Sequence, residues 1–296
     1  MDIRAVIMGV AFAVMWSSAF TSARIIVADA PPLAALSLRF LISGLLGIAV
    51  AKALGQSWTL TPRQWKATII FGICQNALYL GLNFVAMQTI EAGLAAIIAS
   101  ALPLLVAFSG WILFGERLRP MGVLGLLAGF AGVALIMGSR ISGGVDLFGL
   151  LLCGLGVLAL TFATLSVRGA SSGGNVLMIV GLQMLVGSAA LGVAAGFTET
   201  LEFTPSWKLL AAFVYTTLIP GLAATVVWFM LVNRIGAVRA STFHFLNPFL
   251  GVAIAAAFLG EALGMLDILG VGIITAGILA VQLSKQAPAR NRMASN

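Results

Sequence analysis

The chain has 296 residues, of which 61% are hydrophobic and only 8% are charged. A soluble domain carries about 25% charged residues, so this composition, with a mean hydropathy of +1.11, excludes a soluble globular protein and indicates a polytopic membrane protein. A net charge of +7 in a soluble chain would suggest a nucleic-acid partner. In a membrane protein the basic residues report on topology instead, so we expect no nucleic-acid partner.

Ten apolar segments follow one another along the chain, each close to the roughly 20 residues that a helix needs to cross the hydrocarbon layer. The connections between them are too short for a soluble domain. We expect spans at residues 3–27, 33–53, 66–88, 92–114, 120–138, 147–168, 176–196, 208–232, 237–259 and 265–284. The predicted fold class is therefore an all-α integral membrane protein with ten transmembrane helices.

One pattern occurs twice: a proline inside an apolar segment, followed by a Gly-Glu pair at the end of the segment. Pro103 precedes Glu116 as Pro248 precedes Glu261, and both matches have a shift of 145 residues. Both prolines are expected to interrupt backbone hydrogen bonding and kink their helices. The duplication indicates two five-helix halves.

Because five is an odd number, the second half must enter the membrane from the opposite side. Inverted repeats of this kind build transporters around a shared site near the midplane. We expect a first repeat over residues 1–140, an inverted second repeat over 141–284 and a cytoplasmic tail over 285–296.

The basic residues predict the orientation, because they stay cytoplasmic when they flank short loops. With the N-terminus inside, eleven lie at inner ends of the spans and three at outer ends, so both termini are expected in the cytoplasm. The inner set is Arg4, Lys52, Arg63, Lys66, Arg117, Arg119, Arg168, Arg234, Lys285, Arg290 and Arg292; the outer set is Arg24, Arg140 and Lys208.

The third expected span carries a row of polar residues. Gln75, Tyr79 and Asn83 are spaced i, i+4, i+8, which places them on one stripe of a helix. Polar groups at membrane depth face a cavity or a polar partner. The stripe therefore predicts a lining for a small polar ligand, with interhelical hydrogen bonding as the alternative.

The ninth span carries the one histidine of the chain, His244, followed by Asn247 and Pro248. A histidine there contacts substrate, carries a proton or is a hydrogen-bonded core residue. Metal binding lacks companion ligands. We place His244 and Asn247 among the substrate-binding candidates.

Aromatic residues complete the expected pocket, and Arg39 is the one basic residue near mid-membrane. Arg39 meets either a substrate carboxylate or backbone carbonyls and Gln183, and we favour the structural role. The aromatic lining candidates are Trp16, Phe162, Tyr215 and Trp228.

No Asp or Glu falls in the middle of an expected span, so a carboxylate relay for protons or sodium has no candidate. An intramembrane enzyme needs a nucleophile with a base, or a metal set. A single histidine without such partners argues against catalysis, so we expect no catalytic residues, no metal site and no cofactor.

Two five-helix halves, each closing with the proline, the Gly-Glu pair and a glycine-rich last helix, resemble the drug/metabolite transporter superfamily, EamA type. The resemblance covers nearly the whole chain and is strongest to bacterial amino-acid exporters. It implies export of aromatic and other neutral amino acids across the inner membrane by alternating access through a central cavity, with no oligomer required. A multidrug exporter for quaternary ammonium compounds of the methyl viologen type is the alternative.

Overall fold

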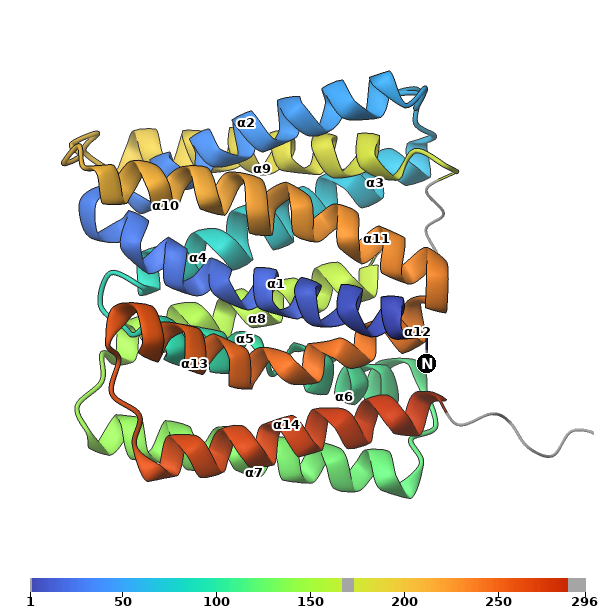
Figure 1. The fold of residues 1–296 in the computed structure, drawn as a ribbon, viewed down its shortest axis with the longest axis vertical. Helices are drawn as coiled ribbons and strands as arrows, with labels where there is room; N and C mark the ends of the chain where they lie inside the picture. The colour runs from blue at the N-terminus through green and yellow to red at the C-terminus, as the bar shows by residue number, and fades with distance from the viewer. Residues whose placement is uncertain (1, 167–172, 287–296) are drawn as a thin grey trace, which may run out of the picture.

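The computed structural model describes residues 2–166 and 173–286, and every regular element in these ranges is a helix (Figure 1). Within these ranges, ten helical stretches are long and apolar enough to cross a membrane, which confirms the predicted all-helical fold with ten spans. Six of these spans are unbroken: α1 (Ile3–Asp29), α2 (Pro32–Ala53), α7 (Pro120–Ser142), α8 (Leu147–Ser166), α9 (Val176–Thr198) and α14 (Met265–Gln286). Arg168, Arg290 and Arg292 lie outside the described residues, as does the tail beyond residue 286.

Four spans are interrupted by a change of helix type or by a turn. Segments η1 and η2 are π-helical and η3 is a 3-10 helix; such breaks occur often at functional sites. The segments are α3 (Pro62–Phe71), η1 (Gly72–Tyr79) and α4 (Leu80–Ala86); α5 (Ala92–Ala99) and α6 (Leu102–Phe114); α10 (Trp207–Leu218), η2 (Ile219–Ala223) and α11 (Ala224–Ile235); and α12 (Ala237–Ala240), η3 (Ser241–Leu246) and α13 (Asn247–Leu259).

The interruptions recur at matching places in the two halves. Helix α6 begins at Leu102 and α13 at Asn247, a shift of 145 residues (247 − 102). Both helices end at a glycine with positive φ, 64° at Gly115 and 69° at Gly260, a left-handed conformation that closes a helix and turns the chain. Helices α6 and α13 therefore share their length and their terminator, while the inversion of the two halves stays a prediction.

Helices α7 and α14 lie side by side at one edge of the molecule (Figure 1) and approach through glycines. A Cβ at Gly125 would lie 2.7 Å from the carbonyl oxygen of Gly277, and one at Gly270 would lie 3.2 Å from that of Gly132. The first contact maps onto the second at the shift of 145 residues. Small residues permit this close packing in lipid.

Helices α2 and α9 form the corresponding pair at the opposite edge (Figure 1). A Cβ at Gly44 would lie 3.0 Å from the carbonyl oxygen of Gly181. Between the same two helices, the Ser37 hydroxyl donates to the carbonyl of Ser188 and the Ser188 hydroxyl donates to that of Ser37, both at 2.8 Å. Reciprocal bonds of this kind fix the register of the two helices.

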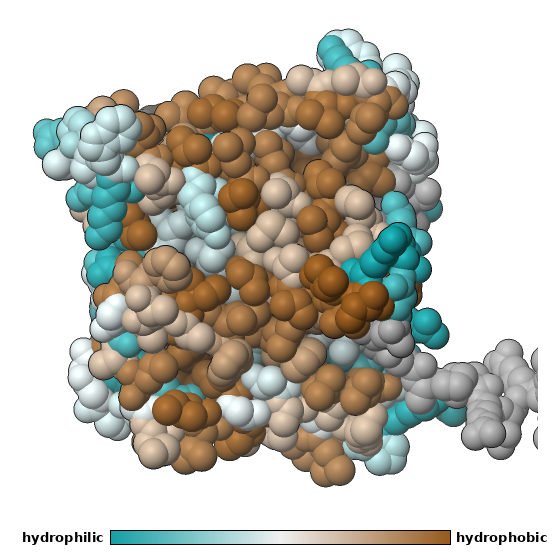
Figure 2. Space-filling view, in the orientation of Figure 1, coloured by the Kyte–Doolittle hydropathy of each residue, from teal (hydrophilic) through white to brown (hydrophobic). Residues whose placement is uncertain are grey.

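The first helix of each half packs into the other half. Helix α1 contacts α10, α11 and α13, whereas α8 contacts η1 and α4. We call the end of the molecule that holds Ile3 and Gln286 the terminal end, and the opposite end the far end; they lie at the right and left of Figure 1. Figure 2 shows hydrophobic residues over the middle of one face and hydrophilic residues toward both ends, as expected for a protein embedded in a bilayer.

Candidate functional site

A small cavity lies beside the middle of α1. Its volume is about 60 Å³, which holds a few water molecules and is well below the roughly 300–1,000 Å³ of pockets that enclose organic ligands. As it stands, the cavity is therefore too small to enclose an organic ligand. Residues in its wall include Trp16, Ala19, Arg39, Tyr79, Asn83 and Pro220.

The cavity lies nearer the far end than the terminal end. Helix α2 begins at the far end and Arg39 is only seven residues beyond Pro32, while Met87, which also lines the cavity, directly follows α4. Arg24 donates to the backbone carbonyls of Met87 and Gln88. This contact ties the far end of α1 to the turn beside the cavity.

Three of the predicted binding residues, Trp16, Tyr79 and Asn83, line this cavity. Tyr79 and Asn83 are 2% and 1% exposed. The Asn83 amide nitrogen donates to the carbonyl of Tyr79 at 2.8 Å, and its oxygen accepts from the Cys153 thiol at 3.3 Å. Asn83 is thus held rigidly between the cavity and α8.

Three predicted residues, Trp16, Trp228 and His244, gather nearer the terminal end around Phe12, which the sequence did not single out. We call these four residues the aromatic cluster. The Phe12 ring centroid lies 4.7 Å from that of Trp228 and 5.4 Å from that of His244. Trp16 lies 6.3 Å from His244 and 5.8 Å from Phe12. Trp16 therefore joins the cavity to the cluster.

Asn247 holds the histidine of the cluster. Its amide nitrogen lies 3.0 Å from Nδ1 of His244, so with this amide orientation Nδ1 accepts and Nε2 carries the proton. The amide oxygen of Asn247 is buried and has no hydrogen-bond partner among the described residues. Such an unsatisfied acceptor is costly and marks Asn247 as a candidate contact for a ligand donor.

Three predicted residues lie apart from both groups. Gln75 is half-buried one turn before Tyr79 and does not line the cavity. The Tyr215 hydroxyl lies 2.8 Å from the Ser18 hydroxyl, and its side chain is 39% exposed. Phe162 is 58% exposed and continues the outer stripe of α8 that includes Leu155 and Leu158, so helix rotation places it toward lipid rather than toward the cavity.

The two prolines each begin the second segment of an interrupted span. Pro103 lies in the first turn of α6 and Pro248 in the first turn of α13, where a missing N–H costs least. The Ser100 hydroxyl donates to the carbonyl of Ala96 at 2.7 Å. Before Pro248, the Asn247 N–H donates to the carbonyl of His244. The interruptions are thus supported by local hydrogen bonds.

Arg39 lines the cavity, whereas the sequence alone favours a structural role for it. Its side chain is 6% exposed, and its Nε donates to the carbonyl of Thr216 at 3.2 Å. Among the described residues, no hydrogen bond joins Arg39 to Gln183, whose backbone carbonyl accepts from the Asn76 side chain instead. The sequence feature that indicates membrane depth for Arg39 is its position, seven residues after Pro32 at the start of α2.

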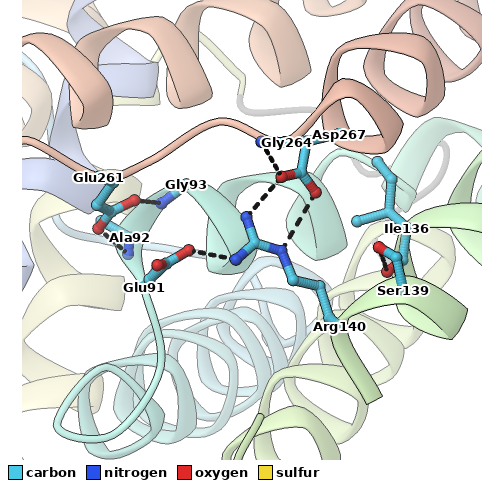
Figure 3. Close-up of polar contacts among 9 residues, drawn as sticks. All are labelled: Glu91, Ala92, Gly93, Ile136, Ser139, Arg140, Glu261, Gly264 and Asp267. Carbon is cyan, nitrogen blue, oxygen red and sulfur yellow. Dashed lines mark hydrogen bonds and ion pairs between the residues drawn. The ribbon is translucent and has the colours of Figure 1, made fainter. Parts of the chain in front are cut away.

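At the far end, an ion network joins the two halves (Figure 3). Arg140 at the end of α7 contacts Glu91 at 2.7 Å and Asp267 of α14 at 2.9 Å. Glu261 accepts from the N–H groups of Ala92 and Gly93 at 2.7 and 2.8 Å, which caps α5. Carboxylates are favourable at helix N-termini, so these contacts hold the far ends of the two halves together.

Asp146 caps the N-terminus of α8, as Glu261 caps that of α5. It accepts from Thr89 Oγ1 at 2.6 Å and from the N–H of Gly149 at 3.0 Å. These hydrogen bonds, that from Thr89 above all, hold the pKa of the Asp146 carboxyl below its ordinary value. This cap keeps its charge throughout the neutral pH range.

Comparison with known proteins assigns the family. The model of the EamA-like transporter family matches residues 3–138 and again residues 147–283. An uncharacterized transporter of Bacillus subtilis, YvbV, is 27% identical over 281 residues, covering 93% of this chain and 90% of that protein. An uncharacterized inner membrane transporter of Escherichia coli K12, YedA, is 28% identical over 278 residues, covering 92% and 88%.

A solved structure shares the fold. One crystal structure superposes on this chain with a TM-score of 0.69 at 22% sequence identity, and the match covers 96% of this chain and 98% of the other. The family model extends over nearly all of the sequence, in agreement with the predicted resemblance. The chain belongs to the EamA-like transporter family and is a multi-pass membrane protein.

Proposed function

We propose that the protein exports aromatic and other neutral amino acids across a bacterial inner membrane by alternating access through the cavity beside α1. The observation that carries this proposal is the cavity wall, where Trp16 and Tyr79 offer aromatic surface beside the polar groups of Arg39 and Asn83. Binding sites for small molecules combine mostly apolar walls with a few fixed polar groups. An amphipathic amino acid needs apolar surface for its side chain and polar groups for its charged ends.

The proposed orientation places the terminal end in the cytoplasm. Basic residues gather there, among them Arg4, Lys52, Arg63 and Lys66, in accord with the preference of basic loop residues for the cytoplasm. The far end carries Glu91, Glu261 and Asp267, and faces the periplasm in this proposal. Export then requires the far-end contacts between the halves to separate when substrate leaves.

Alternating access is supported by the way the halves interlock. Residues 1–140 and 141–284 form the two repeats of the proposal, and each inserts its first helix into the other. The π-helical segments η1 and η2 interrupt equivalent spans next to the cavity. They are the expected points of bending when the small cavity widens to admit a ligand.

The test is uptake of labelled phenylalanine by proteoliposomes that contain the purified protein, with and without an imposed pH gradient. Saturable uptake that the gradient leaves unchanged is the expected result. Accumulation only under the gradient would indicate proton coupling. No uptake above that of empty liposomes by folded protein, together with uptake of methyl viologen, would contradict the amino-acid proposal in favour of a multidrug exporter.

A further inference from the structure

The strongest unassigned feature of the cavity is a buried cation. The Arg39 side chain is 6% exposed, lies against the ring of Phe40 at 5.1 Å, and forms its hydrogen bond through Nε to the Thr216 carbonyl. A guanidinium has five N–H donors. The terminal Nη1 and Nη2 groups donate no hydrogen bond to protein in the described residues.

A glycine keeps space open beside this guanidinium. A Cβ at Gly221, in the π-helical segment η2, would lie only 3.4 Å from Nη2 of Arg39. Any larger side chain would occupy the space between η2 and the guanidinium. The backbone of the second half thus approaches Arg39 closely without covering its terminal nitrogens with a side chain.

The charge of Arg39 has no acidic partner in the protein. All nine Asp and Glu residues of the chain fall within the described ranges, and none forms an ion pair with Arg39. The acids near the far end are engaged elsewhere, Glu261 and Glu199 on helix N-termini and Asp267 on Arg140. A charge buried without a partner is costly, and such residues inside a membrane protein mark substrate paths.

The walls around Arg39 define what fits beside it. Trp16, Phe20 and Phe84 line the same cavity and offer apolar surface, while Tyr79 and Asn83 add polar groups. The planar guanidinium matches a carboxylate, with two parallel N–H donors for its two oxygens. We infer that Arg39 anchors the carboxylate of the transported compound, and that the cavity selects amphipathic carboxylates with an apolar body and rejects organic cations.

This inference rests on the proposed function, whose site it shares, and adds a definite order of ligands. A ligand needs its carboxylate, because no other group in the cavity wall neutralises Arg39. The ligand does not need an amine, because the cavity wall has no carboxylate that would bind an amine. Phenylalanine and 3-phenylpropionate are therefore expected to bind, and phenylalaninamide and phenethylamine are not.

Two readouts on the full-length protein separate this inference from the proposed function. The first is inhibition of labelled phenylalanine uptake in proteoliposomes by the other three compounds. The second is the shift in thermal unfolding temperature that each compound causes in detergent, because a ligand that binds only the folded state raises this temperature. The shift does not depend on transport.

In the wild-type protein, 3-phenylpropionate is expected to inhibit at least about tenfold more strongly than phenethylamine, as the loss of a charge-assisted contact implies. Arg39→Gln is expected to abolish the thermal shift by both carboxylates, and Arg39→Lys to retain part of it. Arg63→Gln removes one exposed cation at the terminal end and is the matched control, with wild-type shifts.

The outcomes are distinct. Equal inhibition by phenethylamine and 3-phenylpropionate in the wild-type protein would overturn the role of Arg39 and leave amino-acid export standing. Failure of phenylalanine uptake, with a thermal shift by 3-phenylpropionate that Arg39→Gln abolishes, would remove the export proposal and support the carboxylate site. The absence of any shift by either carboxylate would overturn the site, even if Arg39→Gln does not fold.

Discussion

Two equivalent helix crossings in the molecule contain opposite kinds of side chain. Where α1 crosses α11, Phe12 packs on Trp228 with ring centroids 4.7 Å apart. At the corresponding crossing of α8 and α4, the residues at shifts of 144 and 145 are Gly156 and Asn83. A Cβ at Gly156 would lie 2.9 Å from the Asn83 amide nitrogen.

The repeat therefore preserves the positions of helix contacts but not the chemistry of the side chains at them. The glycine and asparagine crossing adjoins the cavity, whose wall includes Asn83. The aromatic crossing instead brings the rings of Phe12 and Trp228 together nearer the terminal end. The two halves thus share the positions of these helix crossings, while the side chains at the two crossings differ.

Filling the cavity is expected to have the largest effect. Ala19→Trp places an indole in a space of about 60 Å³, and overpacking displaces neighbouring groups. Phenylalanine uptake should fall at least about tenfold, since the ring occupies the proposed site. Leu158→Trp on the exposed stripe of α8 is the control. Uptake that survives Ala19→Trp would place the site elsewhere.

Truncation of the aromatic crossing comes next. Phe12→Ala removes the ring contacts with Trp16, Trp228 and His244 and should destabilise the protein by about 3 kcal/mol. Thermal unfolding in detergent measures the loss. Val14→Ala, at an exposed position of α1, should have little effect. Equal losses in the two variants would show that the cluster has no special role in stability.

A smaller loss of stability is expected at the crossing of α8 and α4. Gly156→Ala brings a methyl group to 2.9 Å from the Asn83 amide and 3.2 Å from the Tyr79 carbonyl oxygen, which should cost about 1–2 kcal/mol. Gly154→Ala, with nothing within 4 Å of its added Cβ, is the control in the same helix. An unchanged unfolding temperature in Gly156→Ala would show that this crossing is looser than described.

The smallest effect concerns His244. Its Nδ1 faces the Asn247 amide and its ring packs among the aromatic cluster, an arrangement of a core residue rather than a proton carrier. His244→Gln should retain uptake of phenylalanine, with the same response to an imposed pH gradient as the wild-type protein. Loss of a gradient-driven component in this variant alone would make His244 a proton carrier and overturn this interpretation.

Much of the fold was predictable because apolar length and the repeated prolines are local signals. Pro103 and Pro248 mark the interrupted spans directly. The π-helical segments were not predictable, since no residue type specifies them. Phe162 was assigned to the pocket by residue type and depth, but the rotation of α8 depends on glycine contacts such as that of Gly156 with Asn83.

The candidate site was predictable only in part, because long-range contacts decide which side chains face the cavity. Trp16, Tyr79 and Asn83 were recognised as polar or aromatic residues at membrane depth. Arg39 was read as structural because its surroundings come from elsewhere: the Thr216 carbonyl is 177 residues away in the chain. Long-range contacts of this kind leave no mark in a single sequence.

The most direct test of the central claim is protection of a cysteine in the cavity wall by substrate. Ala19→Cys would be made in a chain with Cys74→Ser and Cys153→Ser, and its modification by a membrane-impermeant thiol reagent measured in proteoliposomes with and without phenylalanine. We predict slower modification in saturating phenylalanine, and no effect on the control Thr204→Cys, at an exposed position of the loop between α9 and α10. Equal rates at Ala19 with and without phenylalanine, in protein that still transports it, would contradict binding in this cavity.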